Sequence, residues 1–217
     1  MSTASPLFEP VPSHPPVVGQ PAWDVALLYP PQGQWSEEQY LALTDHTRRL
    51  VEYTDGQIEV LSMPTIEHQL ILKFLFLALN SFVESQKLGE VLFAGTCVYI
   101  DPKKYREPDV VFCSTARRAR SGTRYYDGAD LVMEVVSDDP TSQRRDREQK
   151  ASDYAEGGVP EYWIVDPQLQ KITVLRLQDD VYVEHGGFVP GETATSKLLP
   201  EFSVSVTEVF AAAKPAA

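Results

Sequence analysis

The sequence predicts an α/β or α+β fold, a mixed β-sheet with helices packed against it. Apolar, β-branched runs near residues 91–100, 108–113 and 130–137 are typical of buried strands. Residues 66–86 are apolar on nearly every side, which is typical of a long helix packed on more than one face. The elements follow in the order helix, hairpin, helix, strands, helix, strands. This order does not fit a barrel of repeated βα units.

The N-terminal segment differs from the rest of the chain. Residues 1–34 hold eight of the seventeen prolines and show little periodicity, so we expect an extended arm that contributes little to stability. Residues 35–212 are then a single folded domain, a size that can bury a substantial core. The two cysteines, Cys97 and Cys113, lie in apolar runs without a metal-binding spacing. Free thiols and the absence of a signal-peptide pattern predict a cytoplasmic protein.

Local signals predict the individual elements. Ser36 and Gln39 have the spacing of a capping box at the start of a short helix. Asp55-Gly56 is a two-residue hairpin signal between two strands. A helix near residues 142–156 ends at Gly157-Gly158. The last expected strands are 161–166, stopped by a proline, and the closing antiparallel pair 171–177 and 181–186.

Glu134 lies in the most apolar of these strands, in the run "LVMEVV". A carboxylate buried there without a partner would cost several kcal/mol or would stay protonated. The sequence therefore predicts a cation beside Glu134. A metal ion is one candidate, and an arginine such as Arg106 is another.

Asp109 begins the neighbouring apolar strand, directly after a proline. Two carboxylates at the ends of neighbouring strands form a site for Mg²⁺ or Mn²⁺, because hard cations prefer oxygen ligands and Mg²⁺ takes only one or two protein carboxylates. We expect Asp109 and Glu134 as metal ligands, with the main-chain carbonyl of Val135 as a third. The alternative is that Asp109 binds no metal and only caps the strand or forms an Asx turn.

The helix after this strand carries Asp146, Lys150 and Tyr154 at intervals of four residues, hence on one face. If that face turns toward the sheet, Lys150 lies beside the metal. If it turns outward, Lys150 is only the surface partner of Asp146.

The net charge of the chain argues against binding to nucleic acid by overall electrostatic attraction. The chain carries a net charge of −12. Residues 103–150 hold eleven Lys and Arg against nine Asp and Glu, a balance of +2, so the remainder carries −14. The basic clusters are 103–106, 117–124 and 144–147. They are either solvated loops or contacts for phosphates.

Four segments of the chain resemble a known family. The resemblance lies in the segments "EYTDGQIEVLSMPTIEHQ", "REPDVVF", "DLVMEVVSDDPTSQRRDREQKASDYAEGGVPEYWIVDP" and "LPEFSVSVTEVF". Through them the chain resembles the Uma-type family of putative restriction endonucleases, within the PD-(D/E)XK nuclease superfamily. The resemblance covers residues 35–210. It implies a restriction-endonuclease-like fold and a metal-dependent endonuclease acting on nucleic acid, with DNA the expected partner, as a homodimer away from membranes.

The resemblance assigns roles to named positions. Asp109 and Glu134 match the acidic residues of the motif. The motif's lysine belongs at position 136, where this chain has Val136, so the resemblance implies that Lys150 fills its place. Glu52 belongs to the family pattern as an accessory residue.

His68, Asp146 and Tyr154 are further accessory candidates. His68, in the first turn of the long helix, contacts a phosphate, acts as a base, or only caps and packs that helix. The expected phosphate contacts are Arg106, Arg144 and Arg145, which would position a backbone without reading its sequence.

Two other classes of function stay open. A nuclease fold that has lost activity and serves as a binding module is favoured by Val136 and by the net charge of −12. A sugar hydrolase using two carboxylates would need an aromatic-lined cleft, and no aromatic stripe lies beside either acid.

Overall fold

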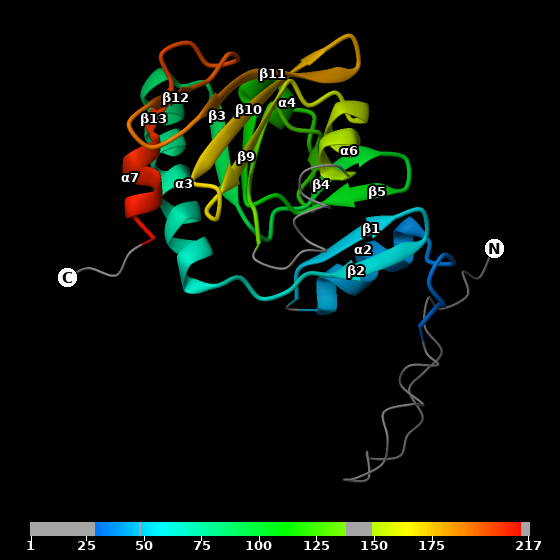
Figure 1. Cartoon of the computed structure of the whole chain (residues 1–217). Coiled ribbons are helices and arrows are strands. Elements are labelled where there is room, and N and C mark those ends of the chain that lie inside the picture. The colour runs from blue at the N-terminus through cyan, green and yellow to red at the C-terminus, as the bar shows by residue number, and fades with distance from the viewer. Residues whose placement is uncertain (1–28, 48, 138–148, 214–217) are drawn as a thin grey trace, which may run out of the picture.

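The fold is a mixed α/β arrangement, as the sequence predicts (Figure 1). A computed structural model of the chain describes residues 29–47, 49–137 and 149–213. The described helices are α2 (Glu37–His46), α3 (Ile66–Gln86), α4 (Thr115–Arg118), α6 (Lys150–Glu156) and α7 (Val206–Ala211). The strands divide over more than one sheet, whereas the sequence suggested a single sheet.

The larger sheet has six strands in the order β11-β10-β9-β8-β6-β3, antiparallel except for the parallel pair β8–β9. Its strands are β3 (Gly89–Phe93), β6 (Val110–Ser114), β8 (Leu131–Val135), β9 (Glu161–Asp166), β10 (Lys171–Gln178) and β11 (Val181–Phe188). The strands that follow Asp109 and carry Glu134, β6 and β8, are neighbours. The prediction that these strands are adjacent in a mixed sheet is confirmed.

The smaller main sheet has five strands in the order β2-β1-β5-β4-β7. Its strands are β1 (Val51–Thr54), β2 (Gln57–Val60), β4 (Val98–Asp101), β5 (Lys104–Arg106) and β7 (Tyr126–Asp127). A third, two-stranded sheet pairs β12 (Thr193–Thr195) with β13 (Ser203–Ser205).

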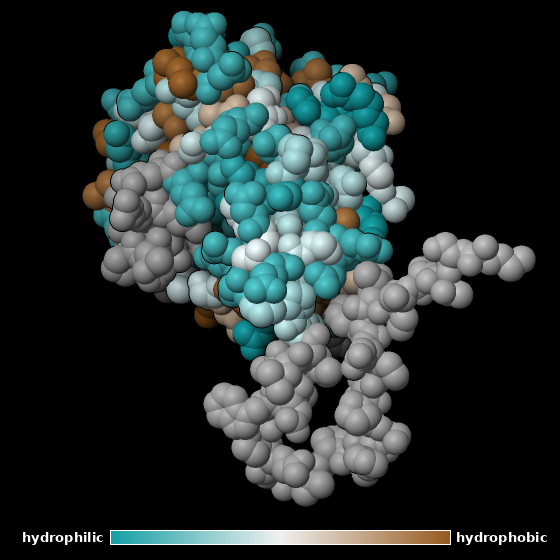
Figure 2. Space-filling model, turned by 90° about the vertical axis from the view of Figure 1, so that its right-hand side faces the viewer, coloured by the Kyte–Doolittle hydropathy of each residue, from teal (hydrophilic) through white to brown (hydrophobic). Residues whose placement is uncertain are grey.

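Helices cover both faces of the six-stranded sheet (Figure 1). On one face, α3 and α7 pack their apolar side chains against the strands, among them Ile71, Leu75 and Phe210. On the other face, Tyr154 of α6 joins a second apolar cluster that includes Val132 and strand β4. The smaller sheet packs on α2 through a cluster of tyrosines. Figure 2 views the side with α6 and the β4–β5 hairpin, and that surface is largely hydrophilic.

Among the described helices, α3 alone is long and apolar enough to cross a membrane by length and composition. Its residues Ile71, Leu75, Leu79 and Val83 are buried against the sheet. We therefore describe α3 as a core helix.

Several local predictions are confirmed. The side chains and backbones of Ser36 and Gln39 form both bonds of a capping box. Asp55 and Gly56 both have positive φ, as a two-residue hairpin loop requires. Helix α6 ends at Gly157, whose Cα lies so close to β4 that a Cβ would meet the Ile100 side chain at 2.6 Å.

Other expectations need correction. The single strand expected over residues 91–100 is two strands in different sheets, because the chain turns at Gly95, which has a φ of +92°. Residues 104–106 of the first basic cluster form β5 and not a loop. The expected helix start at 142 lies outside the described residues.

The last part of the predicted arm is attached to the domain. The side-chain amide of Gln32 donates to the carbonyl of Ile58 and accepts from its N–H, at 2.9 and 2.8 Å. Gly33 also donates to the carbonyl of Gly56. Gln32 therefore covers the open edge of β2 at Ile58, and residues 1–28 lie outside the described part of the chain.

Candidate active site

Two carboxylates come together where β6 begins and β8 ends. The register pairs Val110 with Met133, so Asp109, one residue before β6, falls beside the end of β8. The Oδ2 atom of Asp109 accepts a hydrogen bond from the backbone N–H of Val135 at 2.7 Å. Asp109 and Glu134 both line one small cavity of about 50 Å³.

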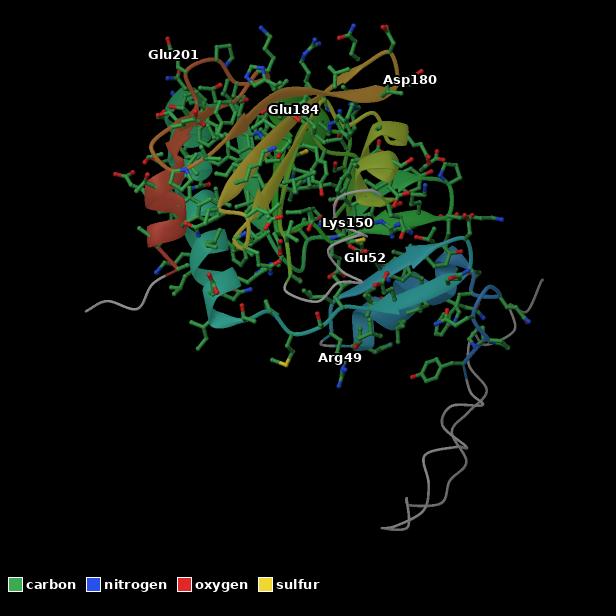
Figure 3. All side chains as sticks on the ribbon, viewed as in Figure 1. Arg49, Glu52, Lys150, Asp180, Glu184 and Glu201 are labelled. Atoms are coloured by element: carbon green, nitrogen blue, oxygen red, sulfur yellow. The ribbon has the colours of Figure 1, made fainter. Side chains whose placement is uncertain are left out.

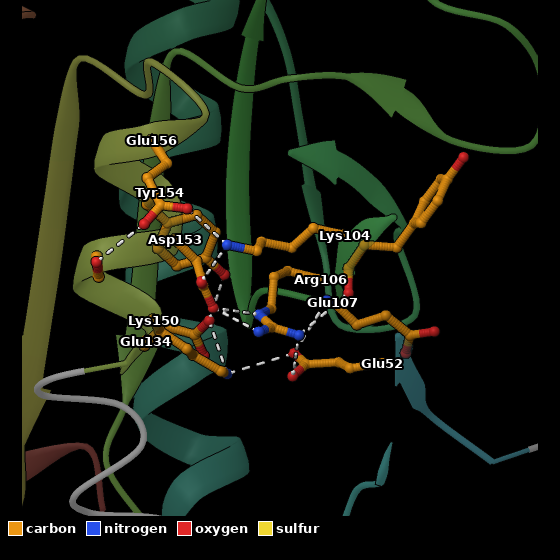
Figure 4. Close-up of polar contacts among 11 residues, drawn as sticks. Glu52, Lys104, Arg106, Glu107, Glu134, Lys150, Asp153, Tyr154 and Glu156 are labelled. Carbon is orange, nitrogen blue, oxygen red and sulfur yellow. Dashed lines mark hydrogen bonds and ion pairs between the residues drawn. The ribbon is translucent and has the colours of Figure 1, made fainter. Parts of the chain in front are cut away.

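The cation beside Glu134 is a lysine from the following helix. The Nζ atom of Lys150 lies 2.9 Å from Oε1 of Glu134, and the Tyr154 hydroxyl donates to the same oxygen at 2.6 Å (Figure 4). Glu134 and Lys150 are both almost fully buried. The described part of the predicted helix face therefore turns inward, toward the sheet. Asp146, the third residue predicted on that face, lies outside the described residues.

Val136 occupies the position where the superfamily motif has its lysine. It is buried in the apolar cluster between the six-stranded sheet and α6, together with Val132 and Tyr154. Alternation along the strand puts position 136 on the same face as Glu134. Lys150 extends toward this face from α6, the helix that covers it. The ammonium group therefore comes from a helix and not from the strand that carries Glu134.

Glu52 of β1 is fully buried, and its side chain lies near Lys150 of α6 (Figure 3). Its Oε1 lies 3.6 Å from the Lys150 ammonium, and it also accepts the backbone N–H of Glu107. Its Oε2 lies 3.6 Å from the guanidinium of Arg106. β1 is an internal strand of its sheet, paired with β2 and β5, and the Glu52 side chain is shielded from solvent.

Arg106 does not fit its predicted role as a phosphate contact. Its side chain is 3% exposed, and its Nε donates to Oδ2 of Asp153 at 3.0 Å. A second guanidinium nitrogen, NH2, bonds to the same oxygen. Arg106 was also the alternative partner that the sequence suggested for Glu134, but it pairs with Glu52 and Asp153. Its guanidinium is engaged inside the protein and is not directed at a phosphate in solvent.

His68, in the first turn of α3, reaches the other side of Asp109. Its Nε2 lies 3.1 Å from Oδ2 of Asp109. Burial lowers the pKa of His68, but the hydrogen bond and negative charge of Asp109 outweigh it, so the pKa is raised. The backbone N–H of His68 is capped by Thr65. His68 therefore faces the carboxylate while its backbone belongs to the helix cap.

Glu107 is a residue of this site that the sequence did not predict. It lines the same cavity as Asp109, and it is 8% exposed. Burial raises the pKa of Glu107 to about 7. Its Oε2 has no hydrogen-bond partner among the described residues. Its place directly before the Pro108-Asp109 pair was the only sequence signal that could have indicated it.

The basic cluster 117–124 begins in helix α4 and is not a loop throughout. Arg117, Arg118 and Arg124 form ion pairs with Asp130, Glu90 and Asp45, respectively. Arg144 and Arg145 lie outside the described residues. The described structure therefore offers little support for phosphate binding by the cluster 117–124.

The donor set at this site fits Mg²⁺ or Mn²⁺ better than Zn²⁺. No group of three His, Cys, Asp or Glu side chains suited to a metal ion occurs in the described parts of the chain. Structural Zn²⁺ sites need four nitrogen or sulfur ligands, whereas Mg²⁺ uses one or two carboxylates and fills its shell with water and phosphate oxygens. Asp109 and Glu134 supply two such carboxylates on one cavity. All described hydrogen bonds of Asp109 fall on Oδ2, which leaves its Oδ1 available.

The sequence and the fold of this chain are both similar to those of known proteins. A family model described as Uma2, putative restriction endonuclease, matches residues 37–207. The fold is similar to the crystal structure of a putative nuclease belonging to DUF820 from Anabaena variabilis ATCC 29413. Sequence identity is 20%, 82% of this chain and 98% of that chain are covered, and the TM-score is 0.65. No curated protein matches the sequence.

At 20% identity, the solved structure shows a shared fold alone. The family match covers more than half of the 217 residues and includes Glu52, Asp109, Glu134 and Lys150. The chain therefore belongs to the Uma2 family of putative restriction endonucleases.

Proposed function

We propose that this protein is a metal-dependent endonuclease that hydrolyses phosphodiester bonds of DNA. The observation that carries the proposal is the Lys150 ammonium, 2.9 Å from Glu134 at the cavity that Asp109 also lines. Two carboxylates and a lysine at one strand end are the groups that this chemistry needs. Membership of a nuclease family supports a nucleic acid as the substrate.

Asp109, Glu134 and the main-chain carbonyl of Val135 would hold Mg²⁺ or Mn²⁺. When bound, such an ion polarises a phosphoryl oxygen and lowers the pKa of a water molecule. The backbone N–H of Val135 and the ring of His68 orient Asp109 from two sides. The Tyr154 hydroxyl and the Lys150 ammonium orient Glu134. Both carboxylates are therefore held in place by protein donors.

Lys150 supplies a positive charge that does not depend on a bound metal ion. An ammonium at this place stabilises negative charge on the phosphate or on the attacking hydroxide. A preorganised charge inside a buried site acts more strongly than the same charge in water. This is the role that the superfamily motif gives to a lysine at position 136, here supplied by the helix.

A second candidate is a nuclease-fold binding module without activity. Two observations favour it: Val136 stands at the motif's lysine position, and Arg117, Arg118 and Arg124 are paired with carboxylates. A sugar hydrolase has less support, because no Phe, Tyr or Trp is among the described residues that line the cavity.

Cleavage assays separate these candidates. The purified protein would be incubated with labelled single-stranded DNA, double-stranded DNA and RNA, each with Mn²⁺, Mg²⁺ or EDTA. We expect cleavage of DNA with Mn²⁺ or Mg²⁺ and none with EDTA. Asp109→Asn should lose cleavage. A parent protein that cuts none of these substrates, yet retains affinity for one of them, would support the binding module instead.

A further inference from the structure

We propose that Arg106 and Asp153 are positioning residues for Lys150, acting through Glu52. This inference rests on the proposed function, because it concerns how the lysine of that site is held. The five side chains form a line of alternating charge. In order they are Glu134, Lys150, Glu52, Arg106 and Asp153 (Figure 4).

The line joins three separate parts of the fold. Glu134 belongs to the six-stranded sheet, Glu52 and Arg106 belong to the five-stranded sheet, and Lys150 and Asp153 belong to α6. Each side chain is at most 7% exposed. Water therefore screens these charges poorly, and each one interacts strongly with its charged neighbours in the line.

The charges along the line balance. Lys104 continues it beyond Asp153, with its Nζ 2.7 Å from Oδ1 of that residue. Glu134, Glu52 and Asp153 carry three negative charges, and Lys150, Arg106 and Lys104 carry three positive charges. Lys104 also contacts Glu156, whose side chain is 53% exposed, so the line ends at the surface.

Arg106 supplies the positive charge on the Oε2 side of Glu52, and the backbone N–H of Glu107 donates to Oε1 of Glu52. The NH1 of Arg106 faces Glu52, while its Nε and NH2 are held by Asp153. The planar guanidinium presents separate nitrogen atoms to the two carboxylates, in a fixed geometry. Glu52 contacts Arg106 through its Oε2, and its Oε1 lies 3.6 Å from the Lys150 ammonium.

A lysine side chain has four rotatable bonds and would otherwise sample many positions. Held between the carboxylates of Glu134 and Glu52, the ammonium keeps one position at the end of β8. The alternative is that the line merely supports the packing of α6 on the sheets. In that case, breaking it would lower stability without moving Lys150.

The variant Glu52→Gln tests the proposal, with Glu161→Gln as the matched control. Glu161 is an equally buried carboxylate on β9 that binds Trp163, Ser196 and two backbone N–H groups, and none of the residues in the line. The first measurement is the rate of Lys150 acylation by acetic anhydride, followed by mass spectrometry. It needs no nuclease activity.

We expect acylation of Lys150 to accelerate at least fivefold in Glu52→Gln and by less than twofold in Glu161→Gln. In the cleavage assay, kcat of Glu52→Gln should fall at least tenfold while KM and Mn²⁺ affinity change by less than twofold. Glu161→Gln should retain the kcat of the parent. Unchanged acylation and unchanged kcat in folded Glu52→Gln would overturn the positioning role.

Asp153→Asn removes the charge at the far end of the line and tests Arg106 and Asp153 directly, whether or not Glu52→Gln folds. We expect the same changes as in Glu52→Gln, at smaller size. Unchanged acylation in Asp153→Asn would then overturn the proposal. If the parent cleaves no nucleic acid, the proposed function fails, but the acylation result still decides whether the line holds Lys150.

Discussion

Replacing Glu134 by glutamine tests how the buried carboxylate is compensated. The sequence alone suggests that this change could raise stability without metal, because it removes a buried charge. The structure predicts the opposite. Glu134 is paired with the Lys150 ammonium at 2.9 Å and accepts the Tyr154 hydroxyl at 2.6 Å. Glu134→Gln would leave the buried lysine with less negative charge around it.

The size of the effect follows from these contacts. Breaking a buried ion pair by removing one partner costs about 3–5 kcal/mol. Two features favour the lower end of that range. The glutamine oxygen can still accept from Tyr154, and Glu52 remains 3.6 Å from the ammonium. We therefore expect a loss of about 3 kcal/mol in the free energy of unfolding.

Urea denaturation in EDTA measures this loss. With a slope of about 2–3 kcal/mol per molar, the midpoint should fall by roughly 1–1.5 M. The double variant Glu134→Gln with Lys150→Met removes both charges, and we expect it to recover about 1–2 kcal/mol relative to the single variant. If Glu134→Gln were as stable as the parent, the pair would contribute nothing and this reasoning would be refuted.

Three further predictions concern other residues. Lys150→Ala should lose most Mn²⁺-dependent cleavage of plasmid DNA while calorimetry shows that the ion still binds; parental cleavage rates would remove Lys150 from the mechanism. Because the pKa of Glu107 is raised from 4.5 to about 7, its contribution to stability is full below about pH 4.5 and is lost as the pH rises through 7. Glu107→Gln should flatten the stability profile over this window by at most about 3 kcal/mol, measured by urea midpoints in EDTA, and an unchanged slope would contradict the raised pKa. Deleting residues 1–28 should leave the melting temperature nearly unchanged, whereas deleting 1–34 should lower it by a few degrees, because Gln32 covers the edge at Ile58. Equal melting temperatures for the two deletions would show that this contact adds nothing.

Local patterns in the sequence predicted much of the fold. The capping box at Ser36, the Asp55-Gly56 loop and the apolar helix α3 depend on neighbouring residues, and all three occur as expected. The separation of the strands into two sheets was not predicted. It depends on a turn at Gly95 and on pairing between strands far apart in the chain, which no local pattern contains.

The same distinction holds at the site. The sequence indicated that Glu134 needs a cation and that Lys150 and Tyr154 share a helix face. In the structure, both Lys150 and Tyr154 contact Glu134. The burial of Arg106 could not be foreseen, because "KKYR" has the composition of an exposed loop. Its position depends on Asp153, 47 residues away in the chain. Glu107 was missed for a similar reason, since its surroundings include Glu52, 55 residues away in the chain, and His68.

Diffraction from crystals soaked in Mn²⁺ tests the central claim most directly. The account predicts an anomalous peak at the cavity, with oxygens of Asp109, Glu134 and the Val135 carbonyl at about 2.0–2.3 Å. The peak should disappear in crystals of Asp109→Asn soaked in the same way. A cavity without a peak in the parent crystals, or a peak bound only by other residues, would contradict a metal-dependent nuclease site at the end of β8.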